Sequence, residues 1–95
     1  MSSLHLISKS PASSLLQSCQ AVLSEGDAIL FIEDGIYHNG DAAIESIPSD
    51  IVISVLKEDC IARGIRNSKF DRIDVIDYEG FVKLSCDYDK VVSWF

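Results

Sequence analysis

Three cysteines, two histidines and one aspartate are the side chains of this 95-residue sequence whose types and positions could support chemistry. A cysteine thiolate can carry sulfur or bind a metal, and an aspartate at the end of a strand can lie in a ligand site. The cysteines form no CxxC pair, and the histidines have no ligand spacing with them or with each other. We therefore predict no metal site and no cofactor. The residues are Cys19, Cys60, Cys86, His5, His38 and Asp34.

Cys19 is the candidate catalytic residue, because its thiol could carry sulfur as a persulfide. It lies in the stretch LLQSCQAVL, where Leu15, Leu16, Val22 and Leu23 recur with it at helical spacing. Its alternative role is that of a small apolar core residue. Burial would raise the pKa of the thiol, and the C-terminal half of a helix disfavours an anion. The pattern favours the structural role and leaves Cys19 as the candidate sulfur carrier.

The other candidates have simpler interpretations. Cys60 and Cys86 each have a carboxylate next to them in the sequence, which disfavours a thiolate. Asp34 follows an apolar segment, where α/β proteins often place site residues, but with Gly35 it is also typical of a tight turn. The turn at residues 8–10 contains no glycine, which excludes a dinucleotide or P-loop phosphate cradle.

Apolar segments alternate with helical segments along the chain, which predicts an α/β domain with a mainly parallel sheet of four to five strands. The continuous apolar runs at 28–32 and 51–56 are typical of strands that are covered on both faces. Segment 73–76 alternates and predicts an edge strand. Further strands are expected at 4–7 and 91–95, and helices are expected at 11–23, 40–47, 57–64 and 78–86.

Local signals set the expected helix ends. Ser10 is predicted to cap the first helix, with Pro11 at its first position and Gly26 supplying the left-handed stop. In the last helix we expect Phe81 and Val82 to face the core.

Length and composition indicate a single domain that spans residues 1–95. An apolar share of 47% in so short a chain leaves residues that one core does not hide, which points to partner subunits. The net charge of −7 argues against direct nucleic-acid binding. The longest apolar run has five residues and the start lacks a signal peptide pattern, so we expect no membrane contact and a cytoplasmic location.

Short elements follow one another in a fixed order along the chain: Leu4-His5, Lys9-Ser10-Pro11, Glu25-Gly26-Asp27, Asp34-Gly35, Glu58-Asp59, Ala62-Arg63-Gly64, Asp77-Tyr78, Phe81-Val82 and Trp94. No single element is specific, but the ordered set resembles the DsrH/TusB family over essentially the whole chain. The resemblance implies a three-layer α/β/α domain of the DsrEFH-like type.

The resemblance also implies a role and partners. Members of this family assemble with DsrE/TusD-like and DsrF/TusC-like subunits into a heterohexamer with two copies of each, which relays persulfide sulfur from an upstream carrier protein. In the TusB branch the sulfur goes to 2-thiouridine at the tRNA wobble position, and in the DsrH branch the context is sulfur oxidation. The principal reactive cysteine belongs to the DsrE/TusD-like subunit. The position of Cys19 matches a cysteine of DsrH-like members that some TusB-like members lack.

Three hypotheses follow from these observations. In the first, the chain is a non-catalytic or accessory subunit of a cytoplasmic sulfur-relay complex that supports thiolation of tRNA wobble uridine. In the second, it is a DsrH-type subunit for sulfur oxidation and Cys19 itself carries sulfur. In the third, it is a stand-alone α/β module that binds a small ligand through Asp34 or the capped first helix.

Overall fold

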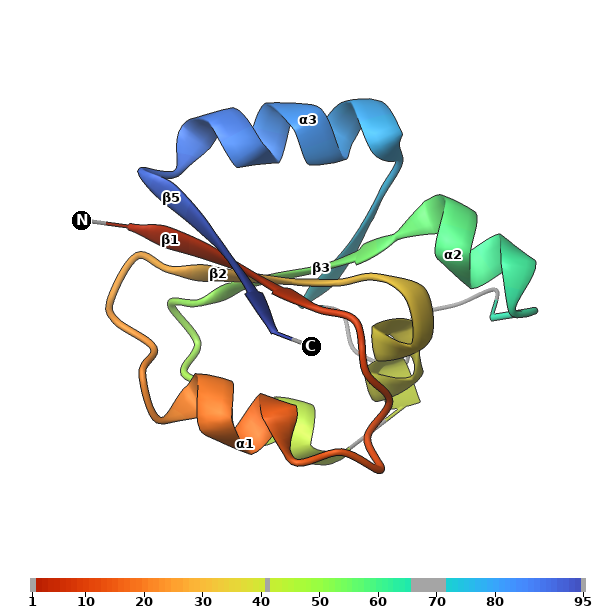
Figure 1. The fold of residues 1–95 in the computed structure, drawn as a ribbon, viewed down its shortest axis with the longest axis horizontal. Helices are drawn as coiled ribbons and strands as arrows, with labels where there is room; N and C mark the ends of the chain where they lie inside the picture. Colours follow the sequence, from red (N-terminus) through yellow and green to blue (C-terminus); the bar gives the residue numbers. More distant parts are fainter. Residues whose placement is uncertain (1, 41, 66–71, 95) are drawn as a thin grey trace.

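The computed structural model describes residues 2–40, 42–65 and 72–94. Within these ranges the strands alternate with helices, as the sequence predicts (Figure 1). The elements in chain order are β1 Ser3–Ile7, α1 Leu15–Gln20, β2 Ala28–Phe31, the 3₁₀ helices η1 Glu33–Gly40 and η2 Ala42–Ser46, β3 Val52–Leu56, α2 Lys57–Ala62, β4 Ile73–Ile76, α3 Tyr78–Asp87 and β5 Lys90–Trp94.

The sheet has the order β4-β3-β2-β1-β5, and every neighbouring pair of described strands is parallel. The first strand β1 therefore lies between β2 and the last strand β5, with Leu4 opposite both Ala28 and Val91. Helix α1 and the 3₁₀ helices lie below the sheet in Figure 1, and α3 lies above it. The predicted parallel α/β fold is confirmed, and so is the three-layer arrangement.

Alternation along the strands divides the core between the two faces of the sheet. Ile29 and Phe31 point toward α1 and join the larger cluster, while Ala28 and Leu30 point toward α3. All four residues of β2 are buried because both faces of this strand are covered, as its continuous apolar run predicts. No described helix is long and apolar enough to cross a membrane.

The predicted start of the first helix was wrong. Helix α1 begins at Leu15 and ends at Gln20, whereas residues 11–14 form turns and bends. The Ser10 hydroxyl accepts a hydrogen bond from the Ala12 N–H, and the Ser10 carbonyl accepts one from the Ser13 N–H. Serine side chains that bond nearby backbone groups compete with helix formation, which explains the late start. Gly26 has the expected left-handed conformation, with φ of 86°, but in the turn beyond the helix.

Two predicted core positions were also wrong. Val22 lies past the end of α1 and is exposed, and Val82 is 62% exposed on the outer side of α3. The phase of α3 is set by its N-cap, where the Asp77 carboxylate accepts a hydrogen bond of 2.8 Å from the Gly80 N–H. That phase turns Phe81 toward the sheet, as predicted.

Helix η1 turns back against the carboxyl end of β1, where the sequence predicts only a tight turn. The Ile7 carbonyl accepts a hydrogen bond of 3.0 Å from the Ile32 N–H, and the Gly35 N–H donates to the Ile32 carbonyl. Gly35 lies so close to Ile7 that a Cβ atom on it would meet the Ile7 carbonyl. Glu33 adopts a left-handed φ of 50° at the start of this turn. The predicted strand at 91–95 corresponds to β5, and Phe95 lies outside the described residues.

Candidate functional site

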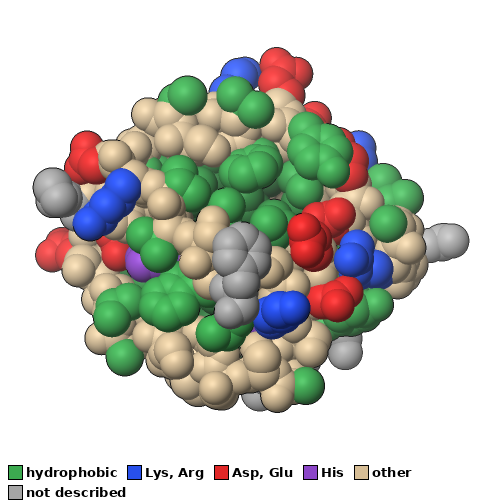
Figure 2. Space-filling model, in the orientation of Figure 1, with side chains coloured by type: hydrophobic (Ala, Val, Ile, Leu, Met, Phe, Trp, Pro, Cys, Tyr) green, Lys and Arg blue, Asp and Glu red, His purple; other side chains and the backbone are tan. Residues whose placement is uncertain are grey.

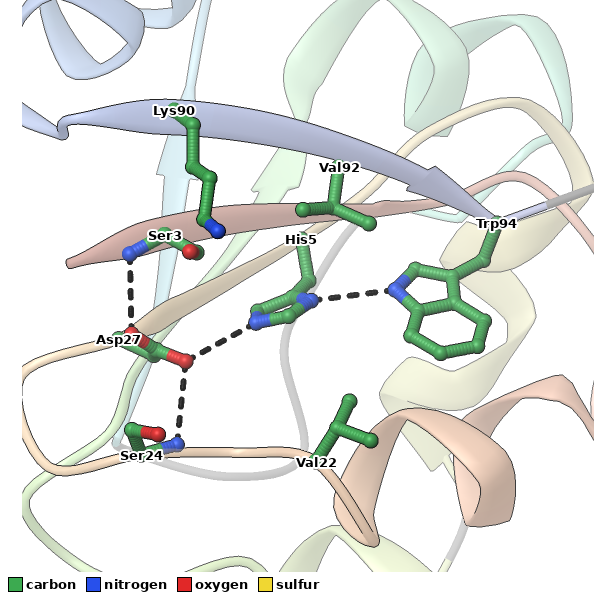
Figure 3. A pocket seen from close by; sticks show the side chains of 8 residues that line it. All are labelled: Ser3, His5, Val22, Ser24, Asp27, Lys90, Val92 and Trp94. Carbon is green, nitrogen blue, oxygen red and sulfur yellow. Dashed lines mark hydrogen bonds and ion pairs between the residues drawn. The ribbon is translucent and has the colours of Figure 1, made fainter. Parts of the chain in front are cut away.

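A pocket of about 340 Å³ lies on the α1 side of the sheet, beside the edge strand β5 (Figure 3). Alternate residues of two neighbouring parallel strands point into it, and the segment between α1 and β2 closes its other side. Its lining residues are Ser3 and His5 from β1, Lys90, Val92 and Trp94 from β5, and Val22, Ser24 and Asp27 from the segment after α1.

Three of these side chains form a hydrogen-bonded chain across the pocket wall. The Trp94 Nε1–H donates to His5 Nδ1 at 3.1 Å, and His5 Nε2 lies 3.0 Å from Asp27 Oδ2. An indole nitrogen can only donate, so His5 Nδ1 carries no hydrogen in this arrangement. With Nδ1 accepting from the indole, the Nε2–H of His5 donates to the Asp27 carboxylate.

Asp27 is the centre of this network. Its carboxylate also accepts hydrogen bonds from the backbone N–H groups of Ser3 at 2.9 Å and Ser24 at 3.1 Å. Burial by itself raises the pKa of Asp27, but the hydrogen bonds from His5, Ser24 and Ser3 outweigh this effect and hold the pKa below its ordinary value. The ionised carboxylate thus ties the start of β2 to β1 and, through His5, to β5.

The geometry of the pocket indicates a role in structure more than in catalysis. Both ring nitrogens of His5 are engaged, and both carboxylate oxygens of Asp27 accept hydrogen bonds. A general base needs a free nitrogen or oxygen within reach of the substrate proton. The pocket is also lined by the exposed residues Lys90 and Ser24 and by Ser3, which is buried.

The structure does not place Cys19 in this pocket. Its side chain is 0% exposed and packs in the α1-side core with Leu16. Burial, with a further contribution from the negative charge of Asp27, raises the pKa of the Cys19 thiol to about 12. Cys60 is also buried, and burial followed by the charge of Asp59 raises its pKa. These surroundings favour the structural role for Cys19 and leave sulfur carriage by it as a prediction.

Asp34 belongs to a second group of charged residues, at the carboxyl ends of β2 and β3. Its carboxylate accepts a hydrogen bond of 3.0 Å from Arg63 Nε, and the Asp59 carboxylate accepts one of 2.7 Å from the Glu33 N–H. Arg63 Nη1 also lies 3.7 Å from Asp59 Oδ1. Asp34 is thus paired with Arg63, and Asp59 holds the start of η1. Among the described residues, no three His, Cys, Asp or Glu side chains are grouped so that they could hold a metal ion.

The His5–Asp27 pair was missed because the two residues are 22 positions apart and meet only when β1 pairs with β2. A signal was present in the sequence: Ser3 and His5 are polar residues on the inward-facing positions of an otherwise apolar strand. A buried histidine on such a strand requires a hydrogen-bond partner, and Asp27 directly precedes the next strand.

Comparisons with known proteins place these features in context. A family model described as "DsrH like protein" matches residues 9–91. The chain is 34% identical to Protein TusB of Enterobacter sp. (strain 638) and 33% identical to Protein TusB of Escherichia coli (strain K12), and each alignment covers 96% of this chain and 99% of the relative.

Two solved structures have a similar fold. The solution structure of protein Tm0979 from Thermotoga maritima gives a TM-score of 0.71 at 18% identity, covering 90% of this chain and 92% of that one. The crystal structure of the ychN protein from Escherichia coli gives a TM-score of 0.67 at 12% identity, covering 99% and 100%.

Proposed function

Because the chain belongs to the DsrH/TusB family, we propose that it is an accessory subunit of a cytoplasmic sulfur-relay complex that supports 2-thiolation of tRNA wobble uridine. The observation that carries this proposal is the match to proteins named TusB along nearly the whole length of both chains. The same observation favours the tRNA branch of the family over the sulfur-oxidation branch.

The proposed partners are DsrE/TusD-like and DsrF/TusC-like subunits, two copies of each with two copies of this chain. An upstream protein delivers the persulfide, and the DsrE/TusD-like subunit receives it. An accessory role agrees with a pocket whose histidine and aspartate are already hydrogen-bonded and with the burial of Cys19 and Cys60. With a net charge of −7, this subunit is not the one that contacts tRNA.

Expressed with the TusC-like and TusD-like proteins of its own organism, the tagged chain should purify with both in equal molar amounts. Size-exclusion chromatography with light scattering should give the mass of a hexamer. Deletion of its gene should remove 2-thiouridine from the affected tRNAs, as measured by nucleoside mass spectrometry. A chain that stays monomeric beside both partners, or a deletion that leaves 2-thiouridine intact, would contradict the proposal.

We also propose that Cys19 serves packing and does not carry sulfur. Burial raises the pKa of the Cys19 thiol to about 12, so the thiol form dominates at neutral pH. Cys19→Ala should cost about 1 kcal/mol of folding free energy, since it deletes one buried sulfur atom. It should still restore 2-thiouridine fully in a deletion strain.

The matched control for this variant is replacement of the reactive cysteine of the TusD-like subunit, which should abolish thiolation. Intact-mass analysis of the wild-type complex after incubation with a cysteine desulfurase and cysteine gives an independent reading. Sulfur added to this chain and lost in Cys19→Ala would show that Cys19 is a carrier after all.

A further inference from the structure

Helix α3 has apolar side chains on two opposite faces. Phe81 and Leu84 point toward the sheet and are partly buried. On the solvent side, residues spaced four apart form an outer stripe of Tyr78, Val82 and Cys86, of which Tyr78 is 55% and Val82 is 62% exposed. Residues at i, i+4 and i+8 form one ridge of a helix surface. A helix that is apolar on both faces is expected to lie between two layers, and the structure supplies only one of them.

Helix α3 also buries little of its own surface against the sheet. No side chain of α3 is fully buried, whereas α1 buries Leu16 and Cys19. On the α3 side of the sheet the fully buried cluster consists of Leu4, Ala28 and Leu30, and the residues packed around them stay partly exposed. Figure 2 shows a group of hydrophobic side chains just below α3, with acidic side chains beside it, and further hydrophobic side chains in the lower half of the view. The α3 side of the sheet is therefore covered less completely than the α1 side.

The negative charge around α3 indicates which kind of chain could pack on its outer face. Four carboxylates flank or lie on the helix, at Asp77, Glu79, Asp87 and Asp89, and Lys83 already forms an ion pair with Glu79. A second copy of this chain would bring the same carboxylates and a net charge of −7 to the contact. Like charges that face each other across an interface repel and weaken binding. The negative charge around α3 therefore favours a different chain, whose Lys and Arg side chains surround its contact surface.

We propose that the outer stripe of Tyr78, Val82 and Cys86 is the docking surface for a helix of a sister subunit, with an apolar ridge flanked by Lys and Arg. This proposal rests on the proposed function, because it takes the occupant from the same complex. The ridge of α3 packs into a groove of the partner helix, and the flanking carboxylates pair with the partner's basic side chains.

Val82→Glu tests the stripe directly. Because Val82 is 62% exposed, the variant should fold with an unchanged melting temperature, yet it places a charge at the centre of the contact. We expect the amount of TusC-like and TusD-like protein that purifies with the tagged chain to fall at least tenfold. The matched control is Ile61→Glu on α2, where a β-branched apolar residue is similarly exposed, at 67%, and this variant should assemble like the wild type.

Alkylation of the wild-type protein tests the surface without mutation. Cys86 is the only exposed cysteine of the three, so a maleimide should modify it in the isolated chain and at least tenfold more slowly in the complex.

Full reactivity of Cys86 in the complex, or assembly of Val82→Glu at the wild-type level, would overturn the docking surface while the complex itself stands. Equal loss of assembly in Ile61→Glu, or protection of Cys86 in a homodimer of this chain, would overturn it as well. Failure of the wild type to bind either partner would remove the proposed function and the docking surface together.

Discussion

Gly35→Ala is expected to lower the free energy of unfolding by about 3 kcal/mol. The added Cβ would meet the Ile7 carbonyl oxygen and lie 2.9 Å from the Ile7 carbonyl carbon. Both neighbours are backbone atoms at the end of a buried strand, so neither can rotate away as a flexible side chain would. The turn into η1 must then move off β1, which weakens the hydrogen bond from the Ile32 N–H to the Ile7 carbonyl. Urea unfolding followed by circular dichroism measures the change.

Gly26→Ala is the control for the conformational preference of glycine. Gly26 has a φ of 86° and nothing within 4 Å of an added Cβ, so only the left-handed backbone opposes the substitution. That effect is about 1 kcal/mol. Similar losses for the two variants would mean that the contact between Gly35 and Ile7 is not a constraint on the fold.

The second large effect is expected for Asp27→Ala, which should cost about 3 kcal/mol, because it removes a charged acceptor of three hydrogen bonds. The substitution leaves the backbone N–H groups of Ser3 and Ser24 and the Nε2–H of His5 without their acceptor, at a position where the carboxylate itself is buried. Asp77→Ala provides the comparison, because that carboxylate caps α3 at the surface with one hydrogen bond. Loss of such a cap costs about 1 kcal/mol. Denaturant titrations of both variants beside the wild type give the two values, and equal costs would contradict the central role of Asp27.

The Asp27 network also predicts a dependence of stability on pH. The pKa of Asp27 is lower in the folded protein than its ordinary value of 3.8, so the unfolded chain binds the proton more tightly. The carboxylate therefore contributes its full stabilisation above about pH 5, and this contribution is lost as the pH falls through 3.8 and then through the lower folded value. Asp27→Asn cannot titrate at this position. The difference in stability between the wild type and Asp27→Asn should shrink steadily from pH 5 to pH 2, and a constant difference would contradict the lowered pKa.

The sheet could be predicted from the sequence because its signal is local and repeated. The run from Ala28 to Ile32 contains only apolar residues, and a strand with no polar face must be covered on both sides. The strand at 73–76 alternates, and it forms one edge. The pattern of apolar and polar side chains in each of these segments was enough to predict that it forms a strand and how many of its faces are buried.

Helix phase and helix start could not be predicted in the same way. Phe81 and Val82 were both predicted to face the core, but neighbouring side chains of a helix point about 100° apart around its axis. The phase depends on where Asp77 caps the helix and on how Gly80 packs against Ile76, which are three-dimensional contacts. Pro11 likewise fits the first position of a helix, yet the hydrogen bonds of Ser10 hold the chain in a turn.

The candidate site was the least predictable part. The sequence shows that Cys19 has a side chain that can react. It does not show how deeply that side chain is buried, and the structure gives it 0% exposure. The network of Trp94, His5 and Asp27 joins residues from both ends of the chain, and no sequence window contains all three. Its discovery required the register that sets β5 beside β1.

The pairing of the first strand β1 with the last strand β5 affects how the molecule folds. Residues 86 to 89 positions apart must meet before this side of the sheet closes, and contacts between such distant parts of a chain form slowly. Until they meet, β1 presents an unfilled edge to the surrounding solution. In a concentrated sample we therefore expect β5 of one molecule to pair with β1 of another, which is a domain swap of the last strand.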